Sequence, residues 1–167
     1  MRKALLAALL VVAALLALAC GEGGDEVMPA VALRLALDVP SEVQVGETVP
    51  LKLTVENLAE VPVEFHTGGR TDTNYVGGYD FVVAHPDGSE VWSWLKSGVV
   101  VEAILSKVTL QPDEQLQFEQ EWPQKDLEGR PVGPGEYLVR GVLTGETTSG
   151  QRFQIETLYE GLVISVG

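Results

Sequence analysis

The chain has 167 residues, and 24 Asp and Glu against 11 Lys and Arg give it a formal net charge of −13 at pH 7. So acidic a surface repels nucleic acids and anionic lipid headgroups, whose binding needs clustered cations, and we expect no nucleic-acid partner. Because Cys20 is the only cysteine, an internal disulfide is excluded and a hydrophobic core must hold the fold together.

The N-terminal segment predicts an exported protein. Arg2 and Lys3 precede an uncharged run, residues 4–19, which is shorter than the roughly 20 residues that a membrane-spanning helix needs. The run ends in Leu16-Ala17-Leu18-Ala19 before Cys20, which resembles the lipobox of bacterial lipoproteins. We therefore expect residues 1–19 to be a lipoprotein signal peptide and Cys20 to carry a lipid. This predicts a protein of the cell envelope, anchored on the extracytoplasmic side of a bacterial membrane.

The rest of the chain predicts a short linker and one domain. Residues 20–29 contain glycines, acidic residues and almost nothing apolar, a composition typical of a flexible linker. Residues 30–167 are long enough for a single domain with its own core. We expect that domain to be a monomer.

Three segments early in the domain predict half-buried strands. Residues 31–39, 49–56 and 61–66 each alternate apolar with polar side chains, the period of two that is typical of a strand. Residues 70–78 lack periodicity and are rich in Thr, Asp, Asn and Gly, so we expect a surface loop there. The loop is either an inert insertion or a segment that binds a partner, for which the candidate residues are Arg70, Thr71, Asp72, Asn74 and Tyr75.

The middle of the domain predicts a β-hairpin. Residues 79–85 and 90–96 flank Pro86-Asp87-Gly88-Ser89, and Asp-Gly favours a tight turn because both residues tolerate positive φ. Trp92 and Trp94 fall on one face of the second strand. They are either two core tryptophans, which we favour, or an exposed anchor for a partner protein.

The C-terminal part of the chain predicts three more strands, residues 114–122, 136–144 and 151–166. The alternation of the last one shifts phase at Glu160-Gly161, which predicts a β-bulge. Tyr137, two residues after Gly135 and two before Val139, resembles the tyrosine corner of immunoglobulin-like domains.

These elements predict an all-β fold class. No segment keeps a helical period over several turns, although residues 99–105 fit either a strand or one helical turn. The chain is therefore expected to be an antiparallel immunoglobulin-like β-sandwich of about seven strands.

The sequence holds no recognisable catalytic or metal-binding motif. Gly-x-Ser-x-Gly and His-Glu-x-x-His are missing, and neither His66 nor His85 has a second ligand at metal-binding spacing. Asp72, Asn74, Asp80 and Asp87 match no calcium-loop spacing. We expect no enzymatic activity, no cofactor and no bound metal.

Short motifs follow one another in a fixed order along most of the domain. They are Leu51-Lys52-Leu53-Thr54-Val55-Glu56-Asn57, Val63-Glu64-Phe65 before Thr67-Gly68-Gly69, Tyr79-Asp80-Phe81-Val82-Val83, Val91-Trp92-Ser93-Trp94, Thr109-Leu110-Gln111-Pro112, and Pro134-Gly135-Glu136-Tyr137-Leu138-Val139. This ordered set resembles the BsuPI family of bacterial proteinase inhibitors. The resemblance implies an immunoglobulin-like sandwich that inhibits serine proteases.

Two functional hypotheses follow. The first is an envelope-anchored inhibitor that binds a serine protease through an exposed loop or a strand edge. Candidate loops are residues 70–78 and 127–134, since Arg70 and Arg130 are basic residues of the kind that trypsin-like specificity pockets prefer. The alternative is a non-inhibitory immunoglobulin-like module that binds another envelope protein or a glycan.

Overall fold

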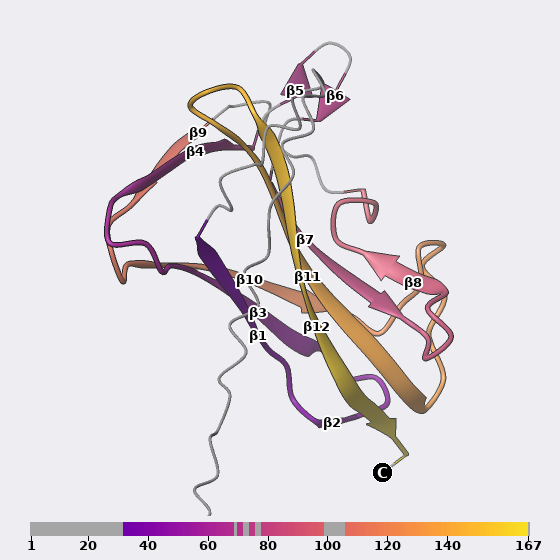
Figure 1. The fold of residues 1–167 in the computed structure, drawn as a ribbon. Coiled ribbons are helices and arrows are strands. Elements are labelled where there is room, and N and C mark those ends of the chain that lie inside the picture. Colours follow the sequence, from indigo (N-terminus) through magenta and orange to yellow (C-terminus); the bar gives the residue numbers. More distant parts are fainter. Residues whose placement is uncertain (1–31, 69, 72–73, 76–77, 99–105, 167) are drawn as a thin grey trace, which may run out of the picture.

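A computed structural model describes residues 32–68, 70–71, 74–75, 78–98 and 106–166 (Figure 1). The predicted signal peptide, Cys20, the linker, Asp72 and residues 99–105 lie outside this part of the chain. Among the described residues, no helix is long and apolar enough to cross a membrane. The strands are β1 (Leu33–Asp38), β2 (Glu42–Gln44), β3 (Val49–Asn57), β4 (Val63–Thr67), β5 (Arg70–Thr71), β6 (Asn74–Tyr75), β7 (Gly78–Ala84), β8 (Glu90–Ser93), β9 (Ser106–Leu110), β10 (Gln115–Trp122), β11 (Gly135–Thr147) and β12 (Arg152–Ser165).

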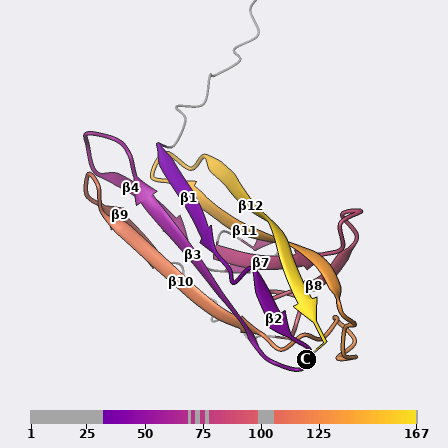
Figure 2. The same cartoon turned by 90° about the horizontal axis from the view of Figure 1, so that it is seen from below.

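Two sheets face each other, which confirms the predicted all-β sandwich. One is three-stranded in the order β1-β3-β10, and the other is seven-stranded and built around β11 and β12. Figure 2 shows β1, β3 and β10 on one side, and β7, β11 and β12 on the other. Along β11 the neighbour changes, because Leu138 to Thr144 pair with β7 whereas Glu146 and Thr147 pair with β4. The ladders are antiparallel except that β2 pairs with β12 in parallel, which the sequence did not predict.

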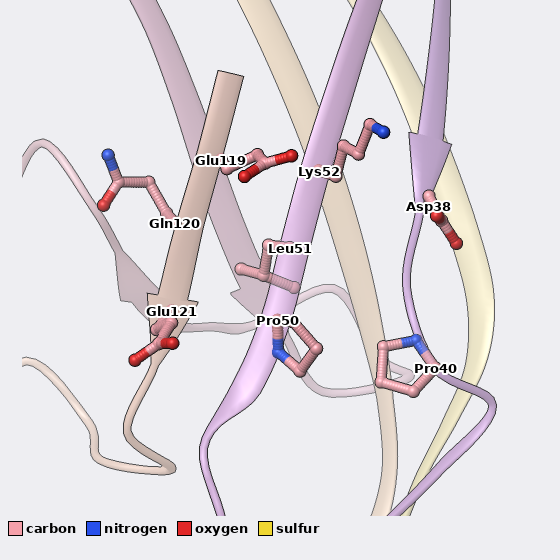
Figure 3. Close-up of a pocket in the computed structure, with 8 residues that line it drawn as sticks. All are labelled: Asp38, Pro40, Pro50, Leu51, Lys52, Glu119, Gln120 and Glu121. Carbon is pink, nitrogen blue, oxygen red and sulfur yellow. The ribbon is translucent and has the colours of Figure 1, made fainter. Parts of the chain in front are cut away.

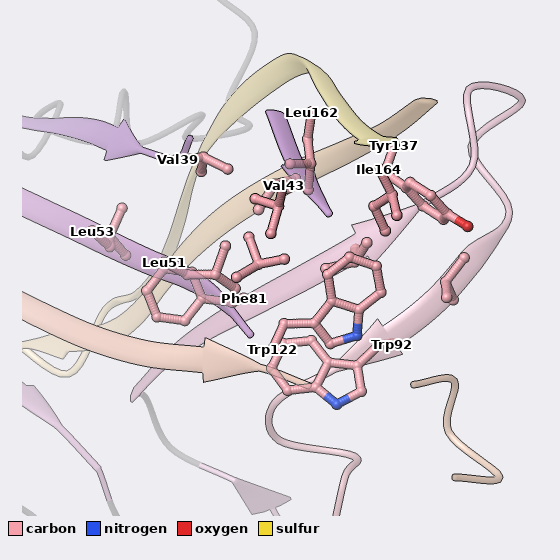
Figure 4. Packing of buried hydrophobic residues seen from close by; sticks show 14 residues of the cluster. Val39, Val43, Leu51, Leu53, Phe81, Trp92, Trp122, Tyr137, Leu162 and Ile164 are labelled. Atoms are coloured by element: carbon pink, nitrogen blue, oxygen red, sulfur yellow. The ribbon is translucent and has the colours of Figure 1, made fainter. Parts of the chain in front are cut away.

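The alternation of buried apolar side chains with outward-facing ones explains why the two sheets pack face to face. In β3 Val49, Leu51, Leu53 and Val55 are almost completely buried, and the residues between them face outward. The main core lies between the sheets, where the rings of Trp92 and Trp122 are 6.5 Å apart (Figure 4). Its other large members are Phe81, Val83, Tyr137, Val139, Leu162 and Ile164.

A smaller core fills the end of the sandwich where the chain passes from one sheet to the other. It contains Leu33, Val55, Phe65, Leu110, Leu143 and Phe153. Residues 58–62, which we call the corner turn, join β3 to β4 here. Asn57 is fully buried beneath them, and its Nδ2 donates to Val61 O and Leu110 O at 2.9 Å each. Its Oδ1 accepts from Ala59 N at 2.8 Å, so every polar atom of this buried side chain has a partner.

Two predicted backbone features are confirmed. Gly161 has no partner in the β11–β12 ladder, since Tyr137 pairs with Leu162 and Leu138 with Glu160, and its φ is +103°. This is the β-bulge. The hydroxyl of Tyr137 donates to Gly133 O, four residues upstream, at 2.8 Å, as a tyrosine corner requires.

The hairpin of β7 and β8 is confirmed, but β8 is shorter than predicted and ends at Ser93. A bulge at Val91 turns both Val91 and Trp92 into the core. Trp94 follows the strand and is only partly buried, with its ring stacked on Tyr79 at 4.6 Å. The prediction of two core tryptophans therefore holds fully for Trp92 and in part for Trp94.

Besides β2, which was not predicted, two segments differ from the sequence prediction. Residues 70–78 were expected to form an irregular loop, but Arg70 and Thr71 pair with Tyr75 and Asn74 as a short ladder, and β7 begins at Gly78. Strand β9 was missed, because Ser106–Leu110 has only Val108 and Leu110 to mark its buried face. Short strands with two apolar residues give too little periodicity to be recognised.

Candidate functional site

The segment that joins β10 to β11, residues 123–134, forms a loop fixed by several side chains, which we call the braced loop. It follows Trp122, the last residue of β10, which is fully buried. The indole Nε1 of Trp122 donates to Lys125 O at 2.9 Å. The main core therefore holds the first turn of the loop directly.

Gln124 ties the braced loop to the turn between β2 and β3. Only 3% of its surface is exposed, and its φ of +52° is unusual for a residue other than glycine. Its Nε2 donates to Gln44 O at 2.7 Å, and its Oε1 accepts from Gly46 N at 2.9 Å. Val132 N in turn donates to Gln124 O at 2.9 Å. The loop and the neighbouring turn are thus joined as one rigid unit.

Asp126 braces the tip of the loop. Its Oδ1 accepts from Glu128 N at 3.0 Å and Arg130 N at 2.8 Å, and its Oδ2 accepts from Arg130 Nε at 2.7 Å. Gly129, with φ of +79°, makes the reversal that brings Arg130 back over the carboxylate. The backbone also closes, since Asp126 N donates to Arg130 O at 2.9 Å.

The electrostatics of the tip agree with this geometry. Desolvation raises the pKa of Asp126, but the hydrogen bonds and charge of Arg130 outweigh it, so that the net pKa lies below the ordinary value. The hydrogen bond and charge of Asp126 in turn raise the pKa of Arg130, with a further contribution from Glu128. Both groups therefore stay charged at neutral pH, and the ion pair persists.

The tip presents a small amphipathic surface. Leu127 is 38% exposed although its N–H is fixed to Val91 O on β8. The side chain of Arg130 is 71% exposed and also pairs with Glu128 at 2.9 Å. A convex loop that already has one conformation loses little entropy when a partner binds. Its chemistry suits contact with a protein surface.

The two loops predicted as partner-binding segments are not brought together. Arg70, Thr71, Asn74 and Tyr75 follow β4, which pairs with the C-terminal end of β11, and Asp72 lies outside the described residues. The braced loop with Arg130 leads instead into the N-terminal end of β11. Thirteen strand residues separate these ends, roughly 40 Å at the usual rise. One protein-binding surface cannot centre on both.

A shallow groove crosses the outer face of the three-stranded sheet (Figure 3). Its volume is about 570 Å³, and Asp38, Lys52 and Glu119 form one row across β1, β3 and β10. Pro40, Pro50 and Glu121 complete much of the lining. Three acidic side chains and one lysine therefore lie in this lining.

Sequence reasoning identified Arg130 and its loop but missed the residues that fix it. Asp126-Leu127-Glu128-Gly129 carried a usable signal, because an Asp followed by a nearby Gly favours a turn in which the carboxylate accepts backbone N–H groups. Gln124 gave no signal, since its partners lie about 80 positions earlier in the chain.

Three solved structures that resemble the chain are distant from it in sequence. AlkC, an alkylpurine DNA glycosylase from Pseudomonas fluorescens, is 19% identical with a TM-score of 0.41, over 79% of this chain and 30% of that one. The CARDB domain of PF1109 from Pyrococcus furiosus is 14% identical with a TM-score of 0.38, over 80% and 94%. The sporulation control protein Spo0M from Bacillus subtilis is 14% identical with a TM-score of 0.40, over 78% and 49%.

Comparison with protein families is more informative. No curated protein sequence matches the chain. The BsuPI family, described as intracellular proteinase inhibitor, matches residues 35–148, which run from β1 through the braced loop to the end of β11. The match covers more than half of the chain and confirms the resemblance seen in the short motifs. The protein therefore belongs to the BsuPI family of proteinase inhibitors.

Proposed function

We propose that the protein is a lipid-anchored proteinase inhibitor of the bacterial cell envelope, which binds a serine protease through the braced loop. The family match over residues 35–148 carries the proposal, because it supports an inhibitor-like domain. The signal-peptide pattern and Cys20 support a location outside the cytoplasm. The activity is a protein–protein contact and needs no catalytic group.

The braced loop suits this role because an inhibitor must keep its binding segment in one conformation. Small exported inhibitors commonly use disulfides for this purpose, and a chain with one cysteine has none within itself. Here Trp122, Gln124 and Asp126 hold the loop by hydrogen bonds. The ordering cost is met when the domain folds and not when the protease binds.

Arg130 and Leu127 are the side chains that the loop offers to a protease. Entry of Arg130 into an acidic specificity pocket would exchange its contacts with Asp126 and Glu128 for a contact with the pocket. Exposed ion pairs stabilise a fold little, so this exchange is not prohibitive. Leu127 would remain beside it as an apolar contact.

The proposal is tested by assaying the mature domain, residues 21–167, against a panel of serine proteases. We expect inhibition of at least one trypsin-like enzyme, and an Arg130→Ala variant to weaken it at least tenfold. Arg152→Ala is the matched control, because Arg152 is also exposed and paired with a carboxylate, Glu146, but lies in β12 near the other end of β11. Absence of inhibition at micromolar concentration would refute the inhibitory function.

A pull-down from the native envelope distinguishes the inhibitor from the alternative, a non-inhibitory binding module. A protease as the main captured protein agrees with the inhibitor. Capture of another envelope protein through the same loop, lost in Arg130→Ala, would favour the binding module. Comparing the proteins captured by the wild type with those captured by Arg130→Ala therefore decides between the two functions.

A further inference from the structure

The corner turn carries two exposed aliphatic side chains. Leu58 is 52% exposed and Val61 is 63% exposed, and Pro62 beside them is also exposed. The other large exposed aliphatic side chains of the described residues are Val45, Leu127, Leu158 and Val166, and Val45 and Val166 lie next to each other at the opposite end of β3. Isolated exposed aliphatic residues are ordinary, but two on one rigid turn form a small apolar tip.

The corner turn is rigid, so its apolar side chains stay displayed. The buried Asn57 side chain holds the turn from inside, by donating to Val61 O and accepting from Ala59 N. Leu58 N donates to Ala32 O at 2.8 Å, which fixes the turn to the first described residue of the domain. The tip and the point where the N-terminal segment enters the domain therefore lie side by side.

The position of Ala32 limits how far the corner turn can lie from the membrane. Ala32 lies twelve positions after Cys20, and a chain of that length spans at most about 40 Å. A lipid on Cys20 would keep Ala32, and with it the corner turn, within that distance of the bilayer surface. The tether gives the corner turn a high effective concentration at the membrane surface, so that even a weak apolar contact with the lipids can form.

We infer that the corner turn, through Leu58 and Val61, rests in the interfacial region of the lipid layer to which Cys20 anchors the protein. This inference depends on the lipid anchor in the proposed function. Burial of two half-exposed aliphatic side chains favours the inserted orientation roughly ten- to a hundredfold, which is too little to bind a free protein but enough to orient a tethered one. Glu60 is an exposed residue of the turn, and backbone hydrogen bonds join Asp113 and Glu114 to Asn57 at its start, so neutral lipid headgroups suit the tip better than anionic ones.

The contact would also orient the braced loop. The corner turn and the braced loop lie at opposite ends of the β3–β10 ladder, since Gln115 pairs with Glu56 near the first and Trp122 with Val49 near the second. Eight strand residues separate them, roughly 25 Å. With the tip on the membrane, the braced loop projects outward to where a protease arrives.

The test uses the full-length protein, expressed in a bacterium that lipidates it and reconstituted in phosphatidylcholine vesicles. Val61→Cys is labelled with an environment-sensitive dye, and Val45→Cys, an exposed valine in the turn before β3 and so at the other end of that strand, is the matched control. Because a lipidated Cys20 has no free thiol, only the introduced cysteine reacts. We expect a blue shift and protection from a water-soluble quencher at position 61 but not at position 45.

The outcomes separate this contact from the anchor. Protein that floats with the vesicles but shows the same emission at both positions overturns the tip contact alone. Protein that does not float, and takes up dye at Cys20, overturns the anchor and the tip contact with it. Adding Leu58→Asp to labelled Val61→Cys should abolish the blue shift while flotation persists, and an unchanged shift would also contradict the inference.

Discussion

At the scale of single residues, Asp80 shows how the fold changes the chemistry of a carboxyl group. Burial beside β8 raises its pKa, although Leu95 N donates to Oδ1 at 3.1 Å and Ser93 Oγ donates to Oδ2 at 2.8 Å. The charged form is therefore less favourable in the folded state than in the unfolded chain. The carboxyl group of Asp80 binds a proton more tightly in the folded domain than in the unfolded chain. Its contribution to stability is therefore lost as pH rises from the ordinary pKa through the raised one.

We expect Asp80→Asn to stabilise the domain at pH 7. An asparagine keeps both contacts, accepting from Leu95 N and donating to Ser93 Oγ, without the cost of burying a charge. The gain should shrink as pH falls through the raised pKa of Asp80, and vanish below the ordinary value of about 3.9. Urea unfolding between pH 3 and pH 8 measures it.

Asp87 provides the control of opposite sign. Hydrogen bonds from the Ser89 hydroxyl and backbone N–H lower the pKa of Asp87, so its ionised form stabilises the fold above the ordinary pKa and loses that contribution in acid. Asp87→Asn should therefore destabilise the domain at pH 7 and approach the wild type at low pH. Equal behaviour of the two variants would contradict the assignment of burial as the cause at Asp80.

At the scale of elements, the long strand β11 depends on two inward-facing glycines. A Cβ at Gly145 would lie 2.6 Å from Cζ of Phe153 and 3.0 Å from His66 O, and one at Gly141 would lie 2.7 Å from a methyl of Leu53. At Gly145 the close neighbours are an aromatic ring and backbone, which cannot simply rotate away. Strand β11 can pair with both β4 and β12 near Gly145 because this residue has no side chain.

Gly145→Ala should destabilise the domain by about 1–3 kcal/mol, because the added methyl overpacks the smaller core. Gly133→Ala is the control and should change stability by less than about 0.5 kcal/mol, since nothing lies within 4 Å of its Cβ. Chemical denaturation measures both. The loss should diminish in a Phe153→Leu background, and additive losses would show that the ring is not the obstacle.

The strands that could be predicted from the sequence are those with one buried face. In β3 and β10 the alternation spans the whole strand, so their bounds differ from the prediction by one residue at most. Strands β2 and β9 are too short to show a period, and the parallel pairing of β2 with β12 joins segments about 120 positions apart. Such pairings depend on the closed sandwich and leave no local pattern.

At the scale of the whole molecule, the proposed function depends on where the domain is held. The motifs of the candidate site could be predicted only in part, because Arg130 and its turn are local whereas the contacts of Gln124 and Leu127 come from distant segments. The proposed anchor is different, because a signal-peptide pattern and a lipobox-like motif are local features of the sequence. The location can therefore be proposed from the sequence alone, whereas the contacts that fix the binding surface could not.

Cys20→Ser should abolish incorporation of a labelled fatty acid into the protein in a bacterial host that processes lipoproteins. Serine lacks the thiol that forms the thioether, so the lipid has no attachment point. Arg130→Ala, which changes the braced loop alone, should keep full labelling. Gel fluorography after metabolic labelling gives the measurement, and a wild-type protein without label would disprove the anchor.

The parallel ladder between β2 and β12 has a consequence for the order of events during biosynthesis. Leu162 and Ile164, which are almost completely buried in the main core, belong to the last strand, and Ile164 pairs with Val43 near the start of the domain. The main core of the domain therefore cannot close before Ile164 has been synthesised. A domain that stays unfolded until its last strand has been made is in the state that threading through a membrane channel requires.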